Sequence, residues 1–295
     1  MSKKVLVLGG TRYFGRHLIE DLLAKKYEVI VATRGNTSTT FSKPVQFVTA
    51  DRLKIADLKS LVQNFGPFDI IFDQVCMSGQ DAENAVEAFG EFCQRYIFTS
   101  TGSVYDFKND SLLLESNFDP KTYKINLTPT NSYQENKRQA EAVFSLQKTM
   151  PVTMVRFPIV LGEDDYTGRL KFHVQKILKG EEIFIPRLAT KMAFINSIEA
   201  GKFLSFMGDH VQFTGPVNAA SNGTVSLLEL VTLIENACGK KAQLASVESA
   251  SNASPFGSEL DFILSNDKAT SLGFSFLNLH DYLPRLINLI ETSLK

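Results

Sequence analysis

Short apolar runs and amphipathic segments alternate along the first 160 residues, and this alternation limits the chain to very few folds. The run Val5–Leu8 is apolar throughout, as in a parallel strand covered on both faces. Further strands are predicted at 28–32, 46–48, 69–72, 95–98 and 152–157. Helical spacing of apolar residues recurs between them, the last such segment being 131–147. Short connections then require an α/β fold with a doubly wound parallel sheet.

Beyond residue 158 the alternation loosens, which predicts a second and smaller unit. Segments 171–178, 227–238 and 282–294 have helical patterns. We therefore expect residues 1–157, with returning segments near 192–221, to form a Rossmann-type dinucleotide-binding domain. Residues 158–191 and 222–295 are expected to form a smaller C-terminal lobe that binds the substrate.

Composition argues against several other classes of protein, although it does not exclude a local basic patch. The net charge of −1 over 295 residues argues against a nucleic-acid partner, which usually needs a basic excess. The first apolar run stops at Gly9-Gly10, far short of a signal core or a membrane span. Three cysteines and four scattered histidines lack metal-ligand spacing and indicate a reduced compartment. We expect a cytoplasmic protein with no metal site and no membrane partner.

A glycine-rich turn joins the first strand to the first helix. In this position glycines allow a tight turn, and backbone N–H groups at the helix N-terminus can bind a pyrophosphate. An ordinary glycine-rich turn is the alternative. Within the turn, the predicted cofactor-binding residues are Gly9, Thr11, Arg12, Tyr13, Phe14 and Gly15.

The end of the second strand normally selects the cofactor. An acidic residue there suits NAD and an arginine suits the 2′-phosphate of NADP. Here Arg34 follows the strand without an acid nearby, and Arg12 can help it to hold a phosphate. We therefore predict NADP as the cofactor, with NAD as the alternative. Arg34 could instead be a solvated surface charge that binds no cofactor. Asp51 and Arg52 follow the third strand, where a carboxylate can accept from the adenine amino group or serve as a helix N-cap or turn residue.

Tyr133 and Lys137 are one helical turn apart and share a helix face. An ammonium beside a phenol favours the phenolate, so such a pair can transfer a proton to or from an alcohol or a carbonyl. A tyrosine and a lysine four positions apart occur often by chance, but the sequence before this pair strengthens the prediction of a catalytic site. Hydroxyl-rich Thr99–Tyr105 follows a central strand, and ligands of open α/β sheets bind at that edge.

Four motifs in this order resemble those of the extended short-chain dehydrogenases, specifically the NAD-dependent epimerase/dehydratase family. The resemblance covers nearly the whole chain, and the motifs are Gly9–Gly15, Thr99–Tyr105, Tyr133-xxx-Lys137 and Arg156–Gly162. It implies that Thr101, Tyr133 and Lys137 are catalytic, with Tyr133 as acid/base. It also implies that Lys137 binds the nicotinamide ribose, and it adds Thr99, Pro158 and Val160 to the cofactor-binding residues.

The chain departs from the family pattern at several positions. Arg12 replaces the second glycine of the fingerprint, which resembles a divergent Gly-Gly-Thr-Arg branch that includes chloroplast stem-loop RNA-binding proteins. Ile159 stands where sugar-nucleotide epimerases often carry asparagine, and Met192-Ala193 replace the usual charged residues. An anionic substrate can still be bound by Arg169, Lys171 and Arg187, unless these are solvated surface charges.

These observations lead us to expect an NAD(P)-dependent epimerase/dehydratase-like oxidoreductase that acts on a nucleotide-sugar-like small molecule by Tyr-assisted hydride transfer. Two alternatives stay open. One is a reductase of another small carbonyl compound, and the other is a non-catalytic dinucleotide-sensing or RNA-binding protein of the same fold. The resemblance also allows a homodimer that pairs helices 81–92 and 131–147.

Overall fold

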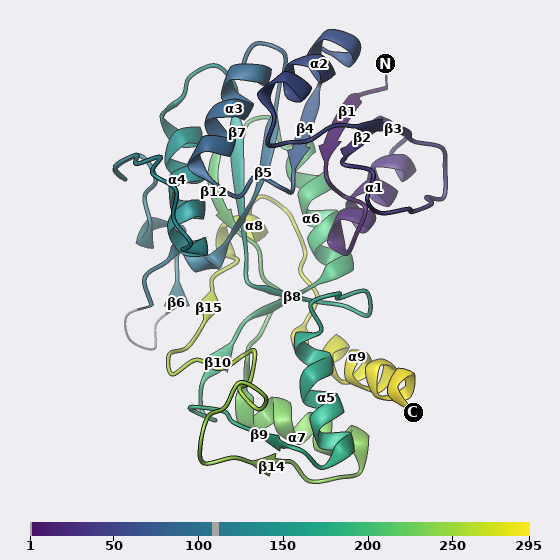
Figure 1. Ribbon diagram of the computed structural model, residues 1–295, viewed down its shortest axis with the longest axis vertical. Helices are drawn as coiled ribbons and strands as arrows, with labels where there is room; N and C mark the ends of the chain where they lie inside the picture. Colours follow the sequence, from purple (N-terminus) through teal and green to yellow (C-terminus); the bar gives the residue numbers. More distant parts are fainter. Residues whose placement is uncertain (1, 108–111) are drawn as a thin grey trace.

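The sheet predicted from the alternating pattern is present as seven strands (Figure 1). The structure is a computed structural model that describes residues 2–107 and 112–295. In sheet order the strands are β12 (Gly215–Asn218), β7 (Val152–Phe157), β5 (Tyr96–Thr101), β4 (Ile70–Asp73), β1 (Lys4–Leu8), β2 (Glu28–Thr33) and β3 (Gln46–Thr49). Every neighbouring pair is parallel, so the predicted α/β fold class is confirmed.

Helices cover both faces of this sheet, because successive side chains of each strand point to opposite faces. Val5 and Val7 of β1 belong to the core under α1 (Phe14–Ala24) and α6 (Ser197–Asp209). Leu6 and Leu8 belong to the core on the other face. The helices over that second face are α2 (Ile55–Phe65), α3 (Gly79–Phe89) and α4 (Tyr133–Leu146).

The sequence pattern predicts no helix at 197–209, yet α6 packs closely along α1. Apolar side chains occupy many of its positions and two glycines interrupt them, so no clean helical period is visible. Close packing against α1 explains why residue 201 is a glycine. A Cβ there would lie 2.6 Å from the backbone nitrogen of Leu18, so only glycine allows the two helices to approach this closely.

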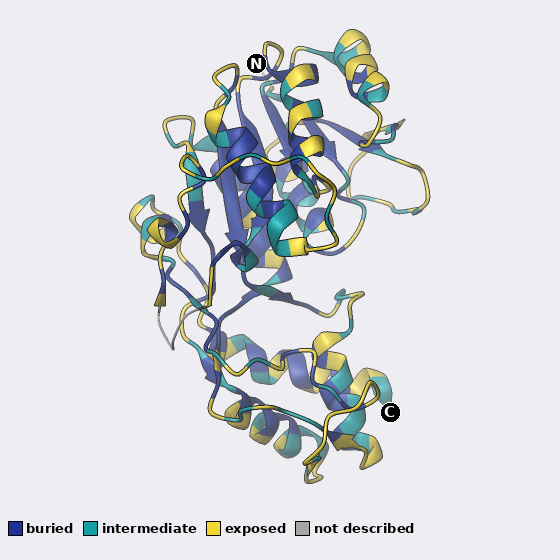
Figure 2. Cartoon of the chain, turned by 60° about the vertical axis from the view of Figure 1, so that its left-hand side comes forward, coloured by how far each residue is buried: buried dark blue, intermediate teal, exposed yellow. Residues whose placement is uncertain are grey.

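Below the sheet in Figure 1 lies a second core, between α5 (Arg169–Lys179), α7 (Leu227–Cys238) and α9 (Leu279–Leu294). Figure 2 shows that these helices bury one side and expose the other. Short strand pairs connect this region: β8 (Ile159–Leu161) with β11 (Phe194–Asn196), β9 (Glu182–Ile183) with β14 (Gln243–Leu244), β10 (Lys191–Met192) with β13 (Val225–Ser226), and β6 (Leu112–Leu113) with β15 (Ile263–Leu264).

One part of the range predicted for the substrate lobe packs elsewhere. Ala269, in α8 (Asp267–Ser271), and Phe276 belong to the core between the sheet and α6. Phe274 and Phe276 also contact the ring of Phe203 on α6. The segment around 267–276 therefore returns to the sheet before α9 begins.

A segment of the chain's own backbone lies along α4. Gln139 on α4 accepts from the amide of Asn126 at 2.7 Å and donates to the carbonyl of Lys124 at 3.2 Å. Asn136 donates to the carbonyl of Thr130 at 2.9 Å. Residues 124–130 thus cover part of the outer face of the helix that begins at Tyr133.

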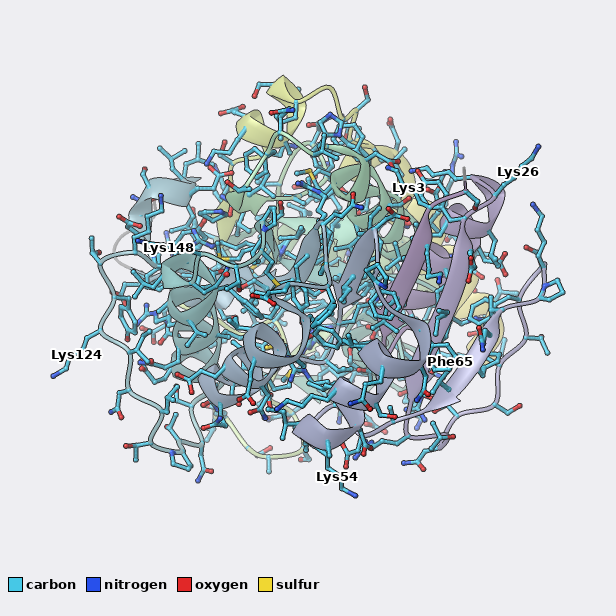
Figure 3. All side chains as sticks on the ribbon, turned by 90° about the horizontal axis from the view of Figure 1, so that it is seen from above. Lys3, Lys26, Lys54, Phe65, Lys124 and Lys148 are labelled. Carbon is cyan, nitrogen blue, oxygen red and sulfur yellow. The ribbon has the colours of Figure 1, made fainter. Side chains whose placement is uncertain are left out.

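Basic residues are spread over the surface. Viewed from above in Figure 3, Lys26, Lys54 and Lys124 lie at separate edges of the molecule. Between residues 2 and 107 and between 112 and 295, no helix has the length and apolar character to cross a membrane.

Candidate active site

The glycine-rich turn predicted to bind phosphate connects β1 to α1. Gly9 and Gly10 have positive φ angles of 88° and 85°, where side chains are strongly disfavoured. A Cβ on Gly10 would also lie 2.8 Å from Val7 Cγ1. Because α1 begins at Phe14, the N-terminus of this helix directly follows the turn, and the amides of Gly15 and Arg16 donate to the carbonyls of Arg12 and Tyr13.

Tyr13, within this turn, uses its side chain to reach the smaller lobe. Its φ of 54° is unusual for a residue with a side chain and implies local backbone strain. The ring is buried, and its hydroxyl donates to the carbonyl of Val160 at 2.5 Å. Burial raises the pKa of Tyr13, so the phenol stays protonated. The turn and β8 are therefore joined directly.

A cavity of about 630 Å³ opens beside the turn, at the carboxyl ends of β1 to β4. The strand order reverses at β1, where ligands of open sheets bind. All but one of the residues predicted for the phosphate and adenosine part of a dinucleotide line this cavity; the exception is Gly15, which packs beneath the turn. The lining residues are Gly9, Thr11, Arg12, Tyr13, Phe14, Arg34, Asp51 and Arg52.

Two exposed arginines, Arg12 and Arg34, line one part of this cavity. Arg34 is exposed just after β2, and the described residues give it no hydrogen-bond or ion-pair partner. Nε of Arg12 donates to Thr37 Oγ1 at 3.2 Å, and its guanidinium lies 5.8 Å from the ring centre of Tyr166. The two cations stand at the end of the cavity where the sequence predicts a 2′-phosphate.

Tyr166 was not singled out from the sequence. It lies in the loop between β8 and α5, lines the cavity, and packs edge-on against Tyr13 with ring centres 6.0 Å apart. In the same loop Asp164 pairs with His17 of α1 at 3.0 Å. A loop of the smaller lobe therefore forms part of the cavity wall, which no local pattern could indicate.

Asp51 and Arg52 have different environments although they are adjacent. Asp51 is partly exposed, and its Oδ1 accepts from the amide of Leu53 at 3.1 Å. Arg52 is buried, and its Nη2 pairs with Asp73 Oδ2 at 2.7 Å. Burial would lower the pKa of Arg52, but the Asp73 carboxylate outweighs burial and raises it. Arg52 is therefore a fixed cation in the cavity wall.

The predicted catalytic pair begins α4. Ser132 caps the helix by accepting from the amide of Glu135, and Tyr133 is the first helical residue, 47% exposed. Lys137 is buried, with Nζ 6.0 Å from the centre of the Tyr133 ring. The ammonium donates to the carbonyls of Cys76 and Thr99 at 2.7 and 2.9 Å. Lys137 thus connects α4 to the chain just after β4 and to β5.

Thr101 is the last residue of β5, three residues later than the predicted end of that strand. Its hydroxyl accepts from the amide of Ser103 at the start of a 3₁₀ turn, Gly102–Val104. Thr99 is buried, and its hydroxyl has no partner among the described residues. Pro158 is buried as well, while the carbonyl of Val160 is occupied by Tyr13.

Behind Tyr133 lies a buried polar network that sequence reasoning missed. Arg156 of β7 and Glu141 of α4 form an ion pair at 2.5 Å, with both side chains fully buried. Ser100 donates to Glu141 at 2.5 Å, and Arg156 donates to the hydroxyl of Tyr105 at 2.9 Å. An arginine inside the otherwise largely apolar strand 152–157 was the available signal, since a buried charge needs a partner.

The residues fall into two groups in space. Thr101, Tyr133 and Lys137 gather near the carboxyl end of β5, while the phosphate and adenosine residues line the cavity over β1 to β4. The other predicted cations lie apart from that cavity. Arg169 and Lys171 are exposed on α5, and Arg187 donates to the carbonyl of Glu259 at 2.9 Å.

Comparison with known sequences gives a family match and distant relatives. Residues 5–219 match the model of the NAD dependent epimerase/dehydratase family. An uncharacterised UDP-glucose epimerase of Bacillus subtilis, YtcB, is 26% identical over 96% of this chain and 98% of its own length. The chloroplast stem-loop binding protein of 41 kDa b of Arabidopsis thaliana is 24% identical over 70% of this chain, and the match spans only 56% of that relative.

Solved structures share the fold over nearly the full chain. A UDP-glucose 4-epimerase of Thermotoga maritima, solved with UDP-glucose, has a TM-score of 0.78 at 15% identity and covers 99% of this chain and 100% of that one. A UDP-glucose 4-epimerase of Thermus thermophilus in complex with NAD has a TM-score of 0.70 at 18% identity, covering 98% of each chain. At these identities the likeness concerns the fold.

Proposed function

Since this chain belongs to the NAD dependent epimerase/dehydratase family, we propose that it is an NADP(H)-dependent enzyme that acts on a nucleotide-sugar-like alcohol or ketone. The observation that carries the proposal is the placement of Tyr133. Its phenol is exposed at the edge of the sheet, and the buried ammonium of Lys137 stands one helical turn behind it. A proton-transfer group beside a dinucleotide cavity fits this chemistry.

The cavity fits a dinucleotide on its own evidence. Arg52 Nη1 and Gln74 Nε2 are buried donors without a partner among the described residues, and both residues line the cavity. Buried donors without acceptors are rare in proteins and suit a ligand rich in acceptor atoms. Gly9 to Gly15 and the N-terminus of α1 would hold the pyrophosphate.

The proposed division of labour follows the family resemblance, and the positions of Tyr133 and Lys137 support it. The nicotinamide ring, when bound, would accept a hydride from a sugar carbon and return it. Tyr133 would take the proton from the hydroxyl on that carbon and later give it back. Lys137 would bind the nicotinamide ribose, and its ammonium places a positive charge behind the Tyr133 ring. The Thr101 hydroxyl would donate to the substrate oxygen as charge develops on it.

NADP is the proposed form of the cofactor. No acid stands at the end of β2, and Arg34 and Arg12 are both on the cavity wall. Paired guanidinium groups suit a phosphate through charge-assisted hydrogen bonds. NAD remains the alternative cofactor. The Thermus thermophilus relative was solved in complex with NAD, which is a property of that protein and does not decide the cofactor of this chain.

The substrate class is proposed from the relatives. The Thermotoga maritima structure contains UDP-glucose, and MoeE5, another solved structure similar to this chain (TM-score 0.73, 18% identity), was solved with UDP-glucose and NAD. Ile159 and Met192 depart from the family pattern at positions expected to contact the substrate, so a standard UDP-sugar is not assumed. Arg169, Lys171 and Arg187 are proposed contacts for an anionic group. A panel of nucleotide sugars with NADP or NAD would identify the substrate by the change in nicotinamide absorbance or by product analysis.

Tyr133→Phe tests the proposed chemistry. We expect kcat on the substrate found by that panel to fall by about 10²–10⁴-fold, with the Kd of the dinucleotide unchanged. Tyr27→Phe is the matched control, because Tyr27 bonds Asp209 far from this edge and its loss should leave kcat unaltered. An unchanged kcat in Tyr133→Phe would show that the proposed enzyme mechanism is wrong.

The Arabidopsis thaliana relative favours a second candidate, a stem-loop RNA-binding protein. The presence of Thr101, Tyr133 and Lys137 supports the enzyme instead, as does the net charge of −1. Filter retention of a labelled RNA stem-loop at moderate salt separates the two. Retention at submicromolar protein, together with absence of turnover, would favour RNA binding.

A homodimer through α3 and α4 remains a proposal. Residues 124–130 occupy part of the outer face of α4, so such a dimer would have to form around that segment. Sedimentation equilibrium measures the assembly directly.

A further inference from the structure

The loop between β8 and α5 borders two cavities of the protein. Tyr166, in the middle of this loop, lines the dinucleotide cavity beside the glycine-rich turn. Gly162, Glu163 and Asp164, at its start, line a second cavity of about 500 Å³, whose other walls come from α1, α6 and α9. The loop therefore has open space in two directions, unlike a segment that is packed into a core.

One ion pair attaches the loop to the first helix. Asp164 Oδ2 lies 3.0 Å from Nε2 of His17 on α1. The other carboxylate oxygen, Oδ1, accepts from the hydroxyl of Ser197 at 2.8 Å. Burial alone would raise the pKa of Asp164, but hydrogen bonds from His17 and Ser197 outweigh it and lower the pKa. Asp164 is therefore a charged anchor for the loop.

The rest of the loop is held lightly. Asp165 Oδ1 accepts from the amide and the hydroxyl of Thr167, and the backbone of Asp165 bonds only to the two glycines that flank the loop. Tyr166 is 68% exposed, and its hydroxyl forms no hydrogen bond with the described part of the chain. Its ring contacts two side chains of the glycine-rich turn. Few contacts would break if the loop moved.

The two ends of the loop differ in their freedom. A Cβ on Gly162 would collide with Ser197 Oγ, so the loop starts from a tightly packed point. Gly168, at the other end, has a φ of 66°, and no atom lies within 4 Å of its Cβ position. Its backbone can turn without a clash, as a hinge requires.

We propose that residues 163–167 form a lid on the dinucleotide cavity, which the pair of His17 and Asp164 holds shut. Tyr166 is the part of the lid that reaches this cavity, and the second cavity gives the displaced loop room. A dinucleotide enters and leaves in proportion to the fraction of time that the lid is open. The inference rests on the proposed function, because it takes the ligand of the cavity to be a dinucleotide.

Stopped-flow fluorescence of the whole protein measures entry and release without requiring turnover. The probes are NADPH and NADH, each mixed with protein for entry and displaced by excess of its oxidised form for release. In His17→Ala we expect both rate constants to rise by about 3–10-fold, as for the loss of one hydrogen bond, and the Kd to change by less than about 2-fold. His17 does not line the dinucleotide cavity, so a lost ligand contact cannot explain this result. Rate constants equal to those of the wild type would overturn the proposal.

A double-mutant cycle assigns the effect to the pair. Asp164→Ala should raise both rate constants at least as much as His17→Ala, because it also removes the bond to Ser197. Adding His17→Ala to Asp164→Ala should then have no further effect, since His17 has no partner left to lose. Effects that multiply in the double variant would show that the two residues act separately, against the proposal.

Two changes at Tyr166 distinguish a lid from a ligand contact. Tyr166→Phe keeps the ring and should keep the wild-type rate constants. Tyr166→Ala shortens the lid and should raise entry and release together. If Tyr166→Ala raises only the release rate, with a matching rise in Kd, the ring contacts the dinucleotide without gating it, and the proposal is wrong.

Arg16→Ala is the matched control. Arg16 precedes His17 on α1, is exposed, and has no hydrogen-bond or ion-pair partner for its side chain among the described residues. Its loss should leave both rate constants unchanged, and a rise as large as that of His17→Ala would contradict the role of the pair. If the wild type binds neither probe, the proposed function fails too, whereas binding at rates that ignore His17 and Asp164 overturns this inference alone.

Discussion

Arg156 and Glu141 form an ion pair, 2.5 Å between Nη2 and Oε2, from which solvent is excluded on both sides. Arg156 is on β7 and Glu141 is on α4, one helical turn beyond Lys137. The pair therefore fixes the helix that carries Tyr133 against the sheet. Arg156 also donates to the carbonyls of Glu115 and Phe118, so it holds the segment that follows β6.

Glu141→Gln should lower the free energy of unfolding by about 3–5 kcal/mol, because it leaves the Arg156 guanidinium buried without a counter-charge. Urea unfolding followed by circular dichroism measures the loss. The double variant Glu141→Leu/Arg156→Met is the control and should cost less than the sum of the two single changes. Additive losses would show that the two side chains do not depend on each other.

Asp209→Asn should remove a pH-dependent part of the stability. Burial alone would raise the pKa of Asp209, but hydrogen bonds from Lys3, Tyr27 and Lys25 outweigh it and lower the pKa from 3.8 to about 2. A carboxyl whose folded pKa is depressed stabilises the fold above its unfolded pKa, and this contribution is lost as the pH falls through the folded value.

The expected difference between wild type and Asp209→Asn is about 1–2 kcal/mol at neutral pH, allowing for partial solvent screening. It should shrink between about pH 4 and pH 2. Urea unfolding at several pH values measures it, with Glu87→Gln as the control for an exposed ion pair. A difference that persists unchanged at the acid end would disprove the account.

Arg34→Ala should weaken NADP binding by about 10–100-fold and leave NAD binding nearly unchanged, because two or three charge-assisted hydrogen bonds are lost. Fluorescence titration with NADPH and NADH reports both affinities. Lys54→Ala removes a charge at the N-cap of α2 and should alter neither. Tighter binding of NADH than NADPH by the wild type would reverse the cofactor assignment.

Gly10→Ala should destabilise the protein by about 3 kcal/mol or more and impair dinucleotide binding, since strain at positive φ adds to overpacking. The new Cβ would lie 2.8 Å from Val7 and 2.9 Å from Ile19. Gly239→Ala separates the two causes, because Gly239 also has positive φ but no atom lies within 4 Å of its Cβ position. That change should cost about 1 kcal/mol. Similar losses in both would mean that packing around Gly10 is unimportant.

The central sheet could be predicted because each strand carries its own local signal. Where strands end was harder to predict. The hydroxyl residues Thr99 to Thr101 suggest a loop by composition, yet they continue β5 because their backbone pairs with β7 up to Phe157. Helix α6 was missed because its glycines are set by distant partners: Gly201 packs against α1, and Gly208 packs against Phe72 of β4. In both cases contacts with neighbouring strands and helices, and not the local secondary-structure propensity, determine the structure.

For the candidate site, the spacing of Tyr133 and Lys137 predicted a shared helix face, and the two side chains do lie together. The contacts that hold Lys137, the carbonyls of Cys76 and Thr99, could not be predicted because they come from other strands and loops. Tyr166 and Asp73 were missed for the same reason. Their roles depend on packing between segments that only the folded chain brings together.

The return of the chain to the sheet after residue 158 limits how this protein can be engineered. The core beneath α1 contains Val160, Phe203, Val217 and Phe276, all from the second half of the chain. A chimera made by joining residues 1–157 to the remainder of a relative would therefore mix two unmatched halves of one hydrophobic core. Exchange of substrate specificity between relatives calls instead for several short grafts, each inserted between two points where the backbone crosses from one core to the other.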